Sequence, residues 1–523
     1  MTAVRRCRLF GVALAVMVVP ACAADRALEL PPVSIAAPAV SAPGALSLEE
    51  AVSLALLHSP SLLAERTGPP LAGTFAAIER AAFDPVLFAE ASYGEDNVEQ
   101  VSRATGARFS VVGQDESGSV GLRQRQPTGS DIELSFRQGR TISNRTPEQV
   151  LGRAGLSLTQ ALLRGASIDA NLVALRQARL AVLESDYQLR GFAETLVAEV
   201  EQAWWEALLA RRSVRIFENA LELARRQGAE ARERVRIGTV PRTELHAIDA
   251  ELARRRQDLI DARSAVTRRC TTLLRLLGVA RSGRWATCPD LQLPAQQAVA
   301  ESVPLAAHLE LALRHRPELN EARLALERGD LELVQTRNGL LPRLDLFVNL
   351  GRTGFADSFA AANRRIDGET YDLQAGLSLE YPLGNRAARA RHQGAALTRL
   401  QRRAGLDNLA TLVDADVRLA VAEVERSAAQ IDATAATLAL QREVLRAEQA
   451  KFGVGRSTAV LVAQAQRDLL QSEIDALQAQ TTHRQALVEL HRLTGTLLMR
   501  RGIVAPGQGG QPAPGAAGGD AVR

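Results

Sequence analysis

Apolar positions along the chain recur with two different periods, and these predict two kinds of element. Ile132, Leu134 and Phe136 alternate with polar residues, which is the two-residue period of a β-strand with unlike faces. Residues 166–236 and 386–452 contain no proline, and as helices each would be roughly 100 Å long at about 1.5 Å per residue. Ordinary globular domains do not contain such helices, so the pattern predicts a mainly α-helical, elongated chain with a smaller β part.

The chain contains an internal duplication, because short segments recur in the same order in its two halves. His58-Ser59-Pro60 matches His315-Arg316-Pro317 at an offset of 257, and Ile237-Gly238 matches Val454-Gly455 at an offset of 217. Between the strands and the long helix the offset is 221, so copy 1 carries 36 extra residues (257 minus 221). Constant offsets within each block indicate two tandem copies of one structural unit.

Both copies are expected to have the order helix, strands, very long helix, shorter helix. Copy 1 (46–280) should have a helix over 48–82 that breaks at Gly68-Pro69-Pro70, strands within 86–162, a long helix over 166–236 and a helix over 242–277. Copy 2 (304–497) should have an unbroken helix over 304–340, strands within 344–381, a long helix over 386–452 and a helix over 456–494. Residues 281–303 are the expected linker.

The helices are predicted to pack side by side, with the two shorter helices of each copy stacked along the long one. Leu245, Leu252, Leu259, Val266 and Leu273 recur every seven residues, which is the seam of a coiled coil. One chain has too few helices to cover all its apolar faces around an axis, so oligomerisation is expected.

The extra residues of copy 1, around Thr105–Asn144, leave two interpretations open. They could add a strand pair or form an exposed loop. Two strand-like runs within 119–138 flank the turn signal Pro127-Thr128-Gly129, which favours a hairpin.

The two ends of the chain are expected to lie outside the packed structure. Residues 1–24 are predicted to be a signal peptide, because arginines precede an apolar run too short to cross a bilayer. Two processing routes remain open: cleavage after Ala23, or lipidation of Cys22 in a sequence similar to a lipoprotein box. Residues 25–45 are expected to form an extended arm, and residues 498–523 a disordered tail.

Composition and charge exclude several classes of function. Aromatic residues are 4% of the 523 residues, too few for one chain that builds a whole membrane barrel or a base-stacking platform. The formal charge of +4 falls to about +1 without Arg5, Arg6 and Arg8, so no basic excess favours nucleic acid. No metal-ligand spacing or nucleophile–base pattern occurs, so we expect no enzyme activity, cofactor or metal. Cys270 and Cys288 form either a disulfide or two unpaired thiols.

Several segments carry a resemblance to a known family. They are Leu46–Ala51, Phe83-Asp84-Pro85, Leu156–Gly165, Arg236–Thr239 and Phe452–Ser457. With the duplication and the helix lengths, they make residues 46–497 similar to the TolC-like outer-membrane efflux proteins. The resemblance implies a mainly α fold with a membrane β-barrel part: a long-helix α-barrel in the periplasm, and strands contributed to a shared trimeric barrel in the outer membrane.

The resemblance also implies partners and a site. The expected assembly is a homotrimer in outer-membrane lipid that contacts a periplasmic adaptor (membrane fusion) protein and, through it, an inner-membrane pump or ABC exporter. In the family the adaptor meets the inner helix-to-helix turns, which correspond here to Gly238, Thr239, Gly453, Gly455, Arg456 and Ser457. The alternative is a plain turn without a partner.

The best-known member of the family narrows its inner tip with acidic residues just after the second turn. The corresponding positions here are Leu461 and Gln464, which are not acidic, so an acidic ring from copy 2 is not supported. Glu244 of copy 1 is the alternative source of a ring, or an ordinary solvated charge. The candidate constriction residues are therefore Glu244 and Gln464.

Three functions are consistent with the sequence. The first is a passive outer-membrane conduit for the efflux of small molecules such as drugs or metals. The second is the same architecture used for type I protein secretion. The third is a periplasmic coiled-coil scaffold or lipoprotein without a pore.

Overall fold

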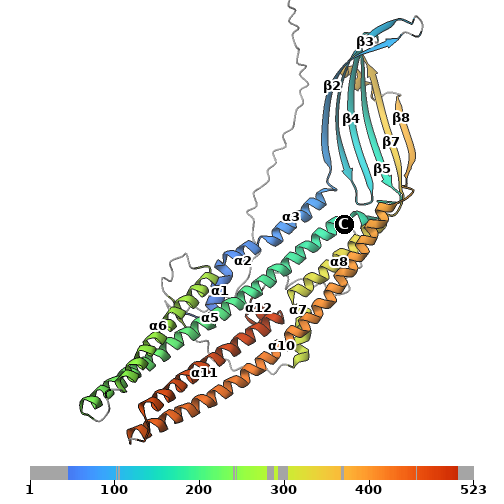
Figure 1. Ribbon diagram of the computed structural model, residues 1–523. Coiled ribbons are helices and arrows are strands. Elements are labelled where there is room, and N and C mark those ends of the chain that lie inside the picture. Colours follow the sequence, from blue (N-terminus) through green and yellow to red (C-terminus); the bar gives the residue numbers. More distant parts are fainter. Residues whose placement is uncertain are drawn as a thin grey trace, which may run out of the picture.

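The computed structural model describes residues 45–504, except 102, 104–105, 146, 239–241, 243, 280–287, 293–303, 367–369 and 455. The described chain is elongated (Figure 1): a curved antiparallel sheet lies at one end, and long helices run from it to two helical hairpins at the other end. The predicted signal peptide, Cys22 and residues 25–44 of the predicted arm lie outside the described residues.

Helices form most of the molecule. Those of copy 1 are α1 (Leu48–His58), α2 (Pro60–Glu65), α3 (Gly68–Ala81), α4 (Ile168–Asn171), α5 (Val173–Arg236) and α6 (Glu244–Leu276). Those of copy 2 are α7 (Leu305–His315), α8 (Pro317–Asn338), α9 (Phe359–Arg364), α10 (Arg386–Gly453), α11 (Ala459–Leu493) and α12 (Leu497–Arg500). The long helices α5 and α10 contain 64 and 68 residues.

The shorter helices stack end to end beside the long ones (Figure 1). Helices α3 and α6 pack along α5, while α8 and α11 lie between α5 and α10 and contact both. The lateral order is therefore α3/α6, α5, α8/α11, α10. One edge of the layer is formed by α3 and α6, and the other edge by α10.

The prediction of an unbroken helix over 304–340 is wrong. The chain leaves the helical conformation at Arg316, where ψ is 123°, and this residue separates α7 from α8. The cause is Pro317, because the residue before a proline disfavours the α conformation. Copy 1 breaks in the same way at Ser59-Pro60, in addition to the expected break before Gly68.

The prediction of a disordered tail from residue 498 is wrong for residues 498–504. Leu497, Leu498 and Ile503 are buried in the largest apolar core, beside Trp204 of α5. Arg501 Nε donates to Oε1 of the buried Glu201 at 2.7 Å. The predicted linker also contains structure, since β6 (Asp290–Leu291) pairs in parallel with β1 (Ala45–Leu46).

One antiparallel sheet contains the strands β2 (Val86–Val101), β3 (Arg108–Arg125), β4 (Ser130–Ser143), β5 (Gln149–Ala161), β7 (Arg343–Ala356) and β8 (Tyr371–Glu380). In the described residues it is six-stranded, in the order β2-β3-β4-β5-β7-β8. The extra residues of copy 1 are thus a strand pair, β3 and β4, and not a loop. Its turn is closed by Gly129, whose φ is +79°.

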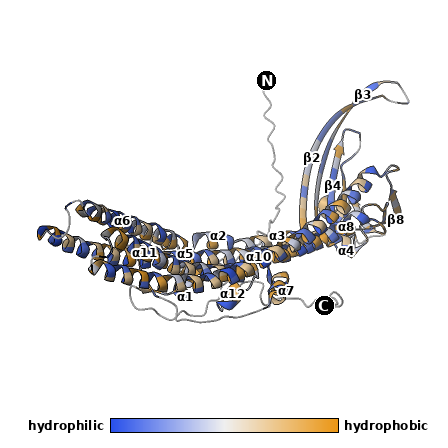
Figure 2. Cartoon of the chain, turned by 60° about the horizontal axis from the view of Figure 1, so that its bottom comes forward, coloured by the Kyte–Doolittle hydropathy of each residue, from blue (hydrophilic) through white to orange (hydrophobic). Residues whose placement is uncertain are grey.

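The long helices mix hydrophobic and hydrophilic residues along their length. Hydrophobic and hydrophilic residues are interspersed from one end of the helical layer to the other (Figure 2). In the part of the chain that the structure describes, no helix combines the length and the apolar character needed to cross a membrane.

Candidate functional site

One face of the sheet carries a continuous apolar row. Leu87, Leu122, Leu134, Leu156, Leu350 and Leu373 occupy successive paired positions across all six strands. Paired residues of neighbouring strands point to the same face, so these six leucines form one line. Their exposed fractions lie between 40% and 74%. A wide apolar face of this kind is stable against lipid and not against water.

The opposite face of the same strands is polar. Residues one position along from the leucines form the paired series Arg123, Glu133, Ser157, Asn349 and Gln374. Hydrogen bonds cross the strands on this face, for example from Ser157 Oγ to Asn349 Oδ1 at 2.6 Å. A sheet with one exposed apolar face and one polar face has the pattern of the wall of a water-filled membrane pore.

The helical hairpins lie at the opposite end of the molecule from the sheet (Figure 1). The α5–α6 turn includes Gly238 with φ of +82° and Ile237 with its side chain exposed. At the α10–α11 turn, Ser457 Oγ donates to Glu448 Oε2 at 2.8 Å, and Lys451 Nζ donates to the same carboxylate at 2.6 Å. The Lys451 ammonium, and then the Ser457 hydroxyl, lower the pKa of Glu448.

The two hairpins are joined by side-chain contacts that were not predicted from the sequence. Arg467 Nη1 of α11 donates to Glu251 Oε2 of α6 at 3.2 Å. Arg255 binds the other oxygen of Glu251 at 2.6 Å. Near the turns, the Arg234 guanidinium of α5 lies 5.4 Å from the centre of the Phe452 ring of α10. The two hairpins of one chain are therefore joined by contacts between its two copies.

The predicted site residues remain distributed over these turns. Gly238, Gly453, Arg456 and Ser457 lie in or beside the two turns, whereas Thr239 and Gly455 are outside the described residues. Gln464 is exposed on α11, and Glu244 is the first residue of α6. A ring at either position would need the neighbouring protomers, so both residues stay predictions.

The two cysteines are joined as a disulfide in the structure. Cys270 near the end of α6 is bonded to Cys288, and their Cα atoms are 5.6 Å apart. Arg211 of α5 donates to the Cys288 carbonyl oxygen at 3.2 Å and to Asp290 at 2.9 Å. The bridge thus fixes the described end of the linker beside the long helix.

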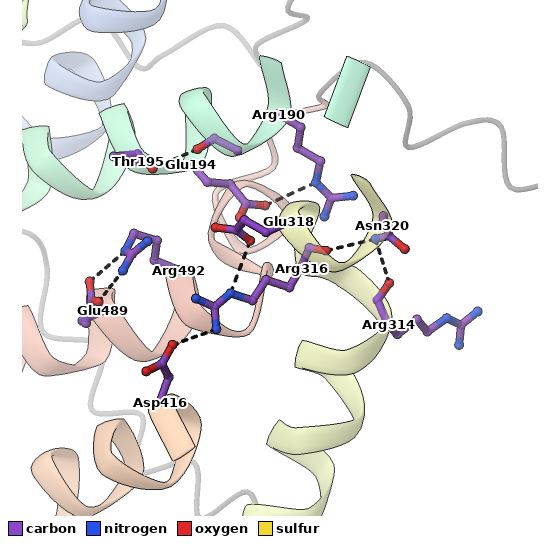
Figure 3. Close-up of polar contacts among 11 residues, drawn as sticks. Arg190, Glu194, Thr195, Arg314, Arg316, Glu318, Asn320, Asp416, Glu489 and Arg492 are labelled. Atoms are coloured by element: carbon purple, nitrogen blue, oxygen red, sulfur yellow. Dashed lines mark hydrogen bonds and ion pairs between the residues drawn. The ribbon is translucent and has the colours of Figure 1, made fainter. Parts of the chain in front are cut away.

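A cluster of charges, in which Arg190 and Glu194 are buried, joins copy 1 to copy 2 (Figure 3). Arg190 of α5 donates to the Gly495 carbonyl oxygen at 2.9 Å and to Glu194 at 3.3 Å. Nearby, Arg316 at the α7–α8 break pairs with Glu318 and, at 3.1 Å, with Asp416 of α10. These charges hold the end of α11 against α5 and the helix break against α10.

The Glu194 carboxyl titrates near neutrality. Burial raises its pKa to about 7, and the attraction of Arg190 only partly opposes this. A carboxyl whose folded pKa exceeds its unfolded value favours the folded state at low pH, and this contribution disappears as pH rises from about 4.5 through 7.

We therefore expect Glu194→Gln to leave stability almost unchanged at pH 5 and to raise it at pH 8. The gain is at most about 3 kcal/mol, because Gln carries no charge that burial penalises. Thermal unfolding between pH 5 and pH 8 measures this difference. Glu199→Gln, at an exposed position on the same helix, is the control and should give parallel curves. Parallel curves for both variants would show that Glu194 does not titrate in this range.

Fold and site together define a class: an outer-membrane channel protein with a pore-wall sheet and a long helical periplasmic extension. The family described as "Outer membrane efflux protein" matches residues 51–279 and 308–496. The chain belongs to this family, whose members form trimers that work with adaptors and inner-membrane pumps and are not enzymes.

Individual relatives agree with this assignment. The chain is 25% identical to the proteases secretion protein PrtF of Dickeya chrysanthemi over 316 residues, which are 60% of this chain and 67% of PrtF. It is 23% identical to the outer membrane protein TolC of Vibrio cholerae, covering 67% of this chain and 78% of TolC. The Campylobacter jejuni CmeC outer membrane channel has a similar fold, with a TM-score of 0.65 at 14% identity over 86% of each chain.

Proposed function

We propose that three copies of the chain form one passive conduit across the outer membrane and the periplasm, through which an inner-membrane pump expels small molecules such as drugs or metals. The observation that carries this proposal is the apolar row that crosses every strand of the sheet, with a polar face behind it. A lone chain leaves β2 and β8 as open sheet edges, and in lipid only closure of the sheet into a barrel satisfies them.

The edges of the helical layer support the same assembly. Leu71, Phe75 and Ile78 form an exposed apolar row on α3, at one edge. The facing surface of a neighbouring protomer would be α10, where Leu397 and Leu400 are exposed at the other edge. Joining α10 of one protomer to α3 and α6 of the next buries both rows and closes the helices into a tube.

Conductance in planar bilayers tests the conduit. Purified trimers should give discrete, long-lived current steps. A folded protein that neither conducts nor fractionates with the outer membrane would instead be the non-conducting scaffold or lipoprotein.

Type I protein secretion is the second candidate, favoured by the similarity to PrtF. Both candidates place an adaptor at the tip residues Gly238, Thr239, Gly453, Gly455, Arg456 and Ser457. They differ in the inner-membrane partner, a pump for efflux and an ABC exporter for secretion. Neighbouring genes and co-purification of cross-linked partners distinguish them.

Arg467→Glu is expected to open the tip. The substitution places a second carboxylate against Glu251, so an ion pair between the hairpins becomes a repulsion. A hydrogen bond between charged groups contributes about 1.5–3 kcal/mol, so the open fraction should rise by about tenfold or more. Single-channel current measures this open fraction.

Arg442→Glu is the control, because Arg442 pairs with Glu473 at 3.8 Å within the α10–α11 hairpin. Equal currents in the two variants would contradict a gating role for the Arg467–Glu251 contact.

A further inference from the structure

We propose that the hairpin β3–β4, which copy 2 lacks, is part of the pore wall, so that a trimer builds an eighteen-stranded barrel. The number follows from three protomers with six described strands each. Without this hairpin both copies would contribute two strands, and the barrel would have twelve. The inference rests on the trimer of the proposed function and adds the size and composition of its membrane pore.

The hydrogen-bonded ladder places the hairpin inside the sheet. Strand β3 is paired with β2 from Val86↔Arg123 to Val101↔Arg108, and β4 is paired with β5 from Ser130↔Gln160 to Thr141↔Gln149. No residues of β2 and β5 pair directly with each other in the described sheet. The hairpin therefore separates these two strands along their whole length and cannot fold aside without opening the wall.

The side chains of the hairpin match both faces of the wall. Leu122 of β3 and Leu134 of β4 continue the apolar row from Leu87 to Leu156. Arg123 and Glu133 continue the polar face between Val86 and Ser157. A loop or ribbon in water has no reason to keep this alternation in register with its neighbours, whereas a strand between lipid and a pore requires it.

The hairpin also spans the full height of the wall. Its turn lies at the helical end of the sheet, where Asn171 Nδ2 of α4 donates to the Pro127 carbonyl oxygen at 2.8 Å. Gln160 Nε2 of β5 donates to the Thr128 carbonyl oxygen at 3.0 Å. At the other end β2 and β3 continue past β4 as a two-stranded ribbon, since β4 pairs with β3 only up to Gly113. Both ends of the added strands therefore lie beyond the apolar row.

A close fit ties β3 to its neighbour on the polar face. The Phe88 ring lies over Gly121, where an added Cβ would come within 2.6 Å of the ring. The Arg123 guanidinium lies 5.7 Å from the centre of the same ring. Glycines covered by a cross-strand aromatic ring fix register in curved sheets, and Phe347 covers Gly376 in the same way between β7 and β8.

The consequence is a wider pore in the membrane. Barrel diameter grows roughly linearly with strand number, so the lumen should be about 1.5 times as wide as that of a twelve-stranded trimer. The helical tube has the same number of helices in either case. The membrane section would then be enlarged independently of the periplasmic tube, and its added lining is charged.

The register defines a deletion that tests this directly. Removal of residues 108–141 joins the β2–β3 connection directly to Ile142. In the wild type Val101 is paired with Arg108, and in the deletion variant it would be paired with Ile142. Leu87 is then opposite Leu156, and every remaining side chain keeps its face. Electron cryo-microscopy of the wild-type trimer in lipid nanodiscs should show eighteen strands, and the deletion variant twelve in a barrel about two-thirds as wide.

Cysteine labelling in proteoliposomes decides the question even if the deletion variant fails to fold. Ser119→Cys and Glu133→Cys should react with a water-soluble maleimide, whereas Leu122→Cys and Leu134→Cys should be protected by lipid. Ser157→Cys and Leu156→Cys on β5 are the matched pair outside the hairpin. Twelve strands in a conducting wild-type trimer, or equal labelling of both faces of β3, would overturn the inference and leave the proposed function intact. A protein that is not trimeric would overturn the proposed function and the strand total together, while labelling would still show whether β3 and β4 are wall strands.

Discussion

Phe75→Glu on α3, and separately Leu400→Glu on α10, should dissociate the trimer into folded protomers. Each side chain is exposed on an edge helix of the layer, at 57% and 65% respectively. Burial of one such side chain is worth about 1.5–3 kcal/mol, and a carboxylate in its place adds a desolvation penalty at each of three seams. Mass photometry in detergent should show mainly monomers, with helix content retained by circular dichroism.

Arg80→Glu is the matched control for this seam. Arg80 is exposed on the same helix but points about 140° away from Phe75, at 100° per residue. The control should remain trimeric. A trimer that survives both Phe75→Glu and Leu400→Glu would show that α3 and α10 do not meet between protomers.

The long elements of the fold could be predicted from local sequence, because their signals are repeated many times. Absence of proline over 166–236 and 386–452 predicts the long helices. Helices α5 and α10 match these ranges closely at the ends that lead into the hairpin turns. The alternation around Ile132 predicts strands, and the structure has them. Both signals depend on backbone periodicity, which can be read directly from the order of apolar and polar residues.

The helix breaks at Pro60 and Pro317 and the described part of the tail were mispredicted, because tertiary contacts decide them. The effect of Pro317 on Arg316 is local. A proline can nevertheless either end a helix or only kink it, and packing decides which of the two occurs. Here Gly495 (φ +65°) lies against the His315 backbone, and a Cβ on it would come within 2.8 Å of that carbonyl. The end of α11 thus packs on the end of α7, a contact that no offset in the sequence reveals.

The candidate site was predictable only in outline. The turns at Gly238 and Gly453 follow from where the helices end. The contact between Arg467 and Glu251 does not, because it joins residues 216 apart whose only signal is opposite charge. The apolar row required the register of five strand pairings, and a one-residue error in any pairing would have moved a leucine to the polar face.

The double substitution Leu156→Arg/Leu350→Arg should prevent the protein from accumulating in the outer membrane. These two leucines are paired between β5 and β7, the strands through which the two copies meet. An Arg on the lipid face near the bilayer centre is destabilising by about 2–4 kcal/mol, and two in each of three protomers give about 12–24 kcal/mol. The control is Arg at Ser157 and Asn349, the neighbouring pair on the polar face, where water solvates both charges. Membrane fractionation should recover the control and lose the Leu156→Arg/Leu350→Arg protein to the periplasm or to degradation. Equal recovery of both would mean that the leucine row does not face lipid, and the sheet would then need another partner for its apolar face.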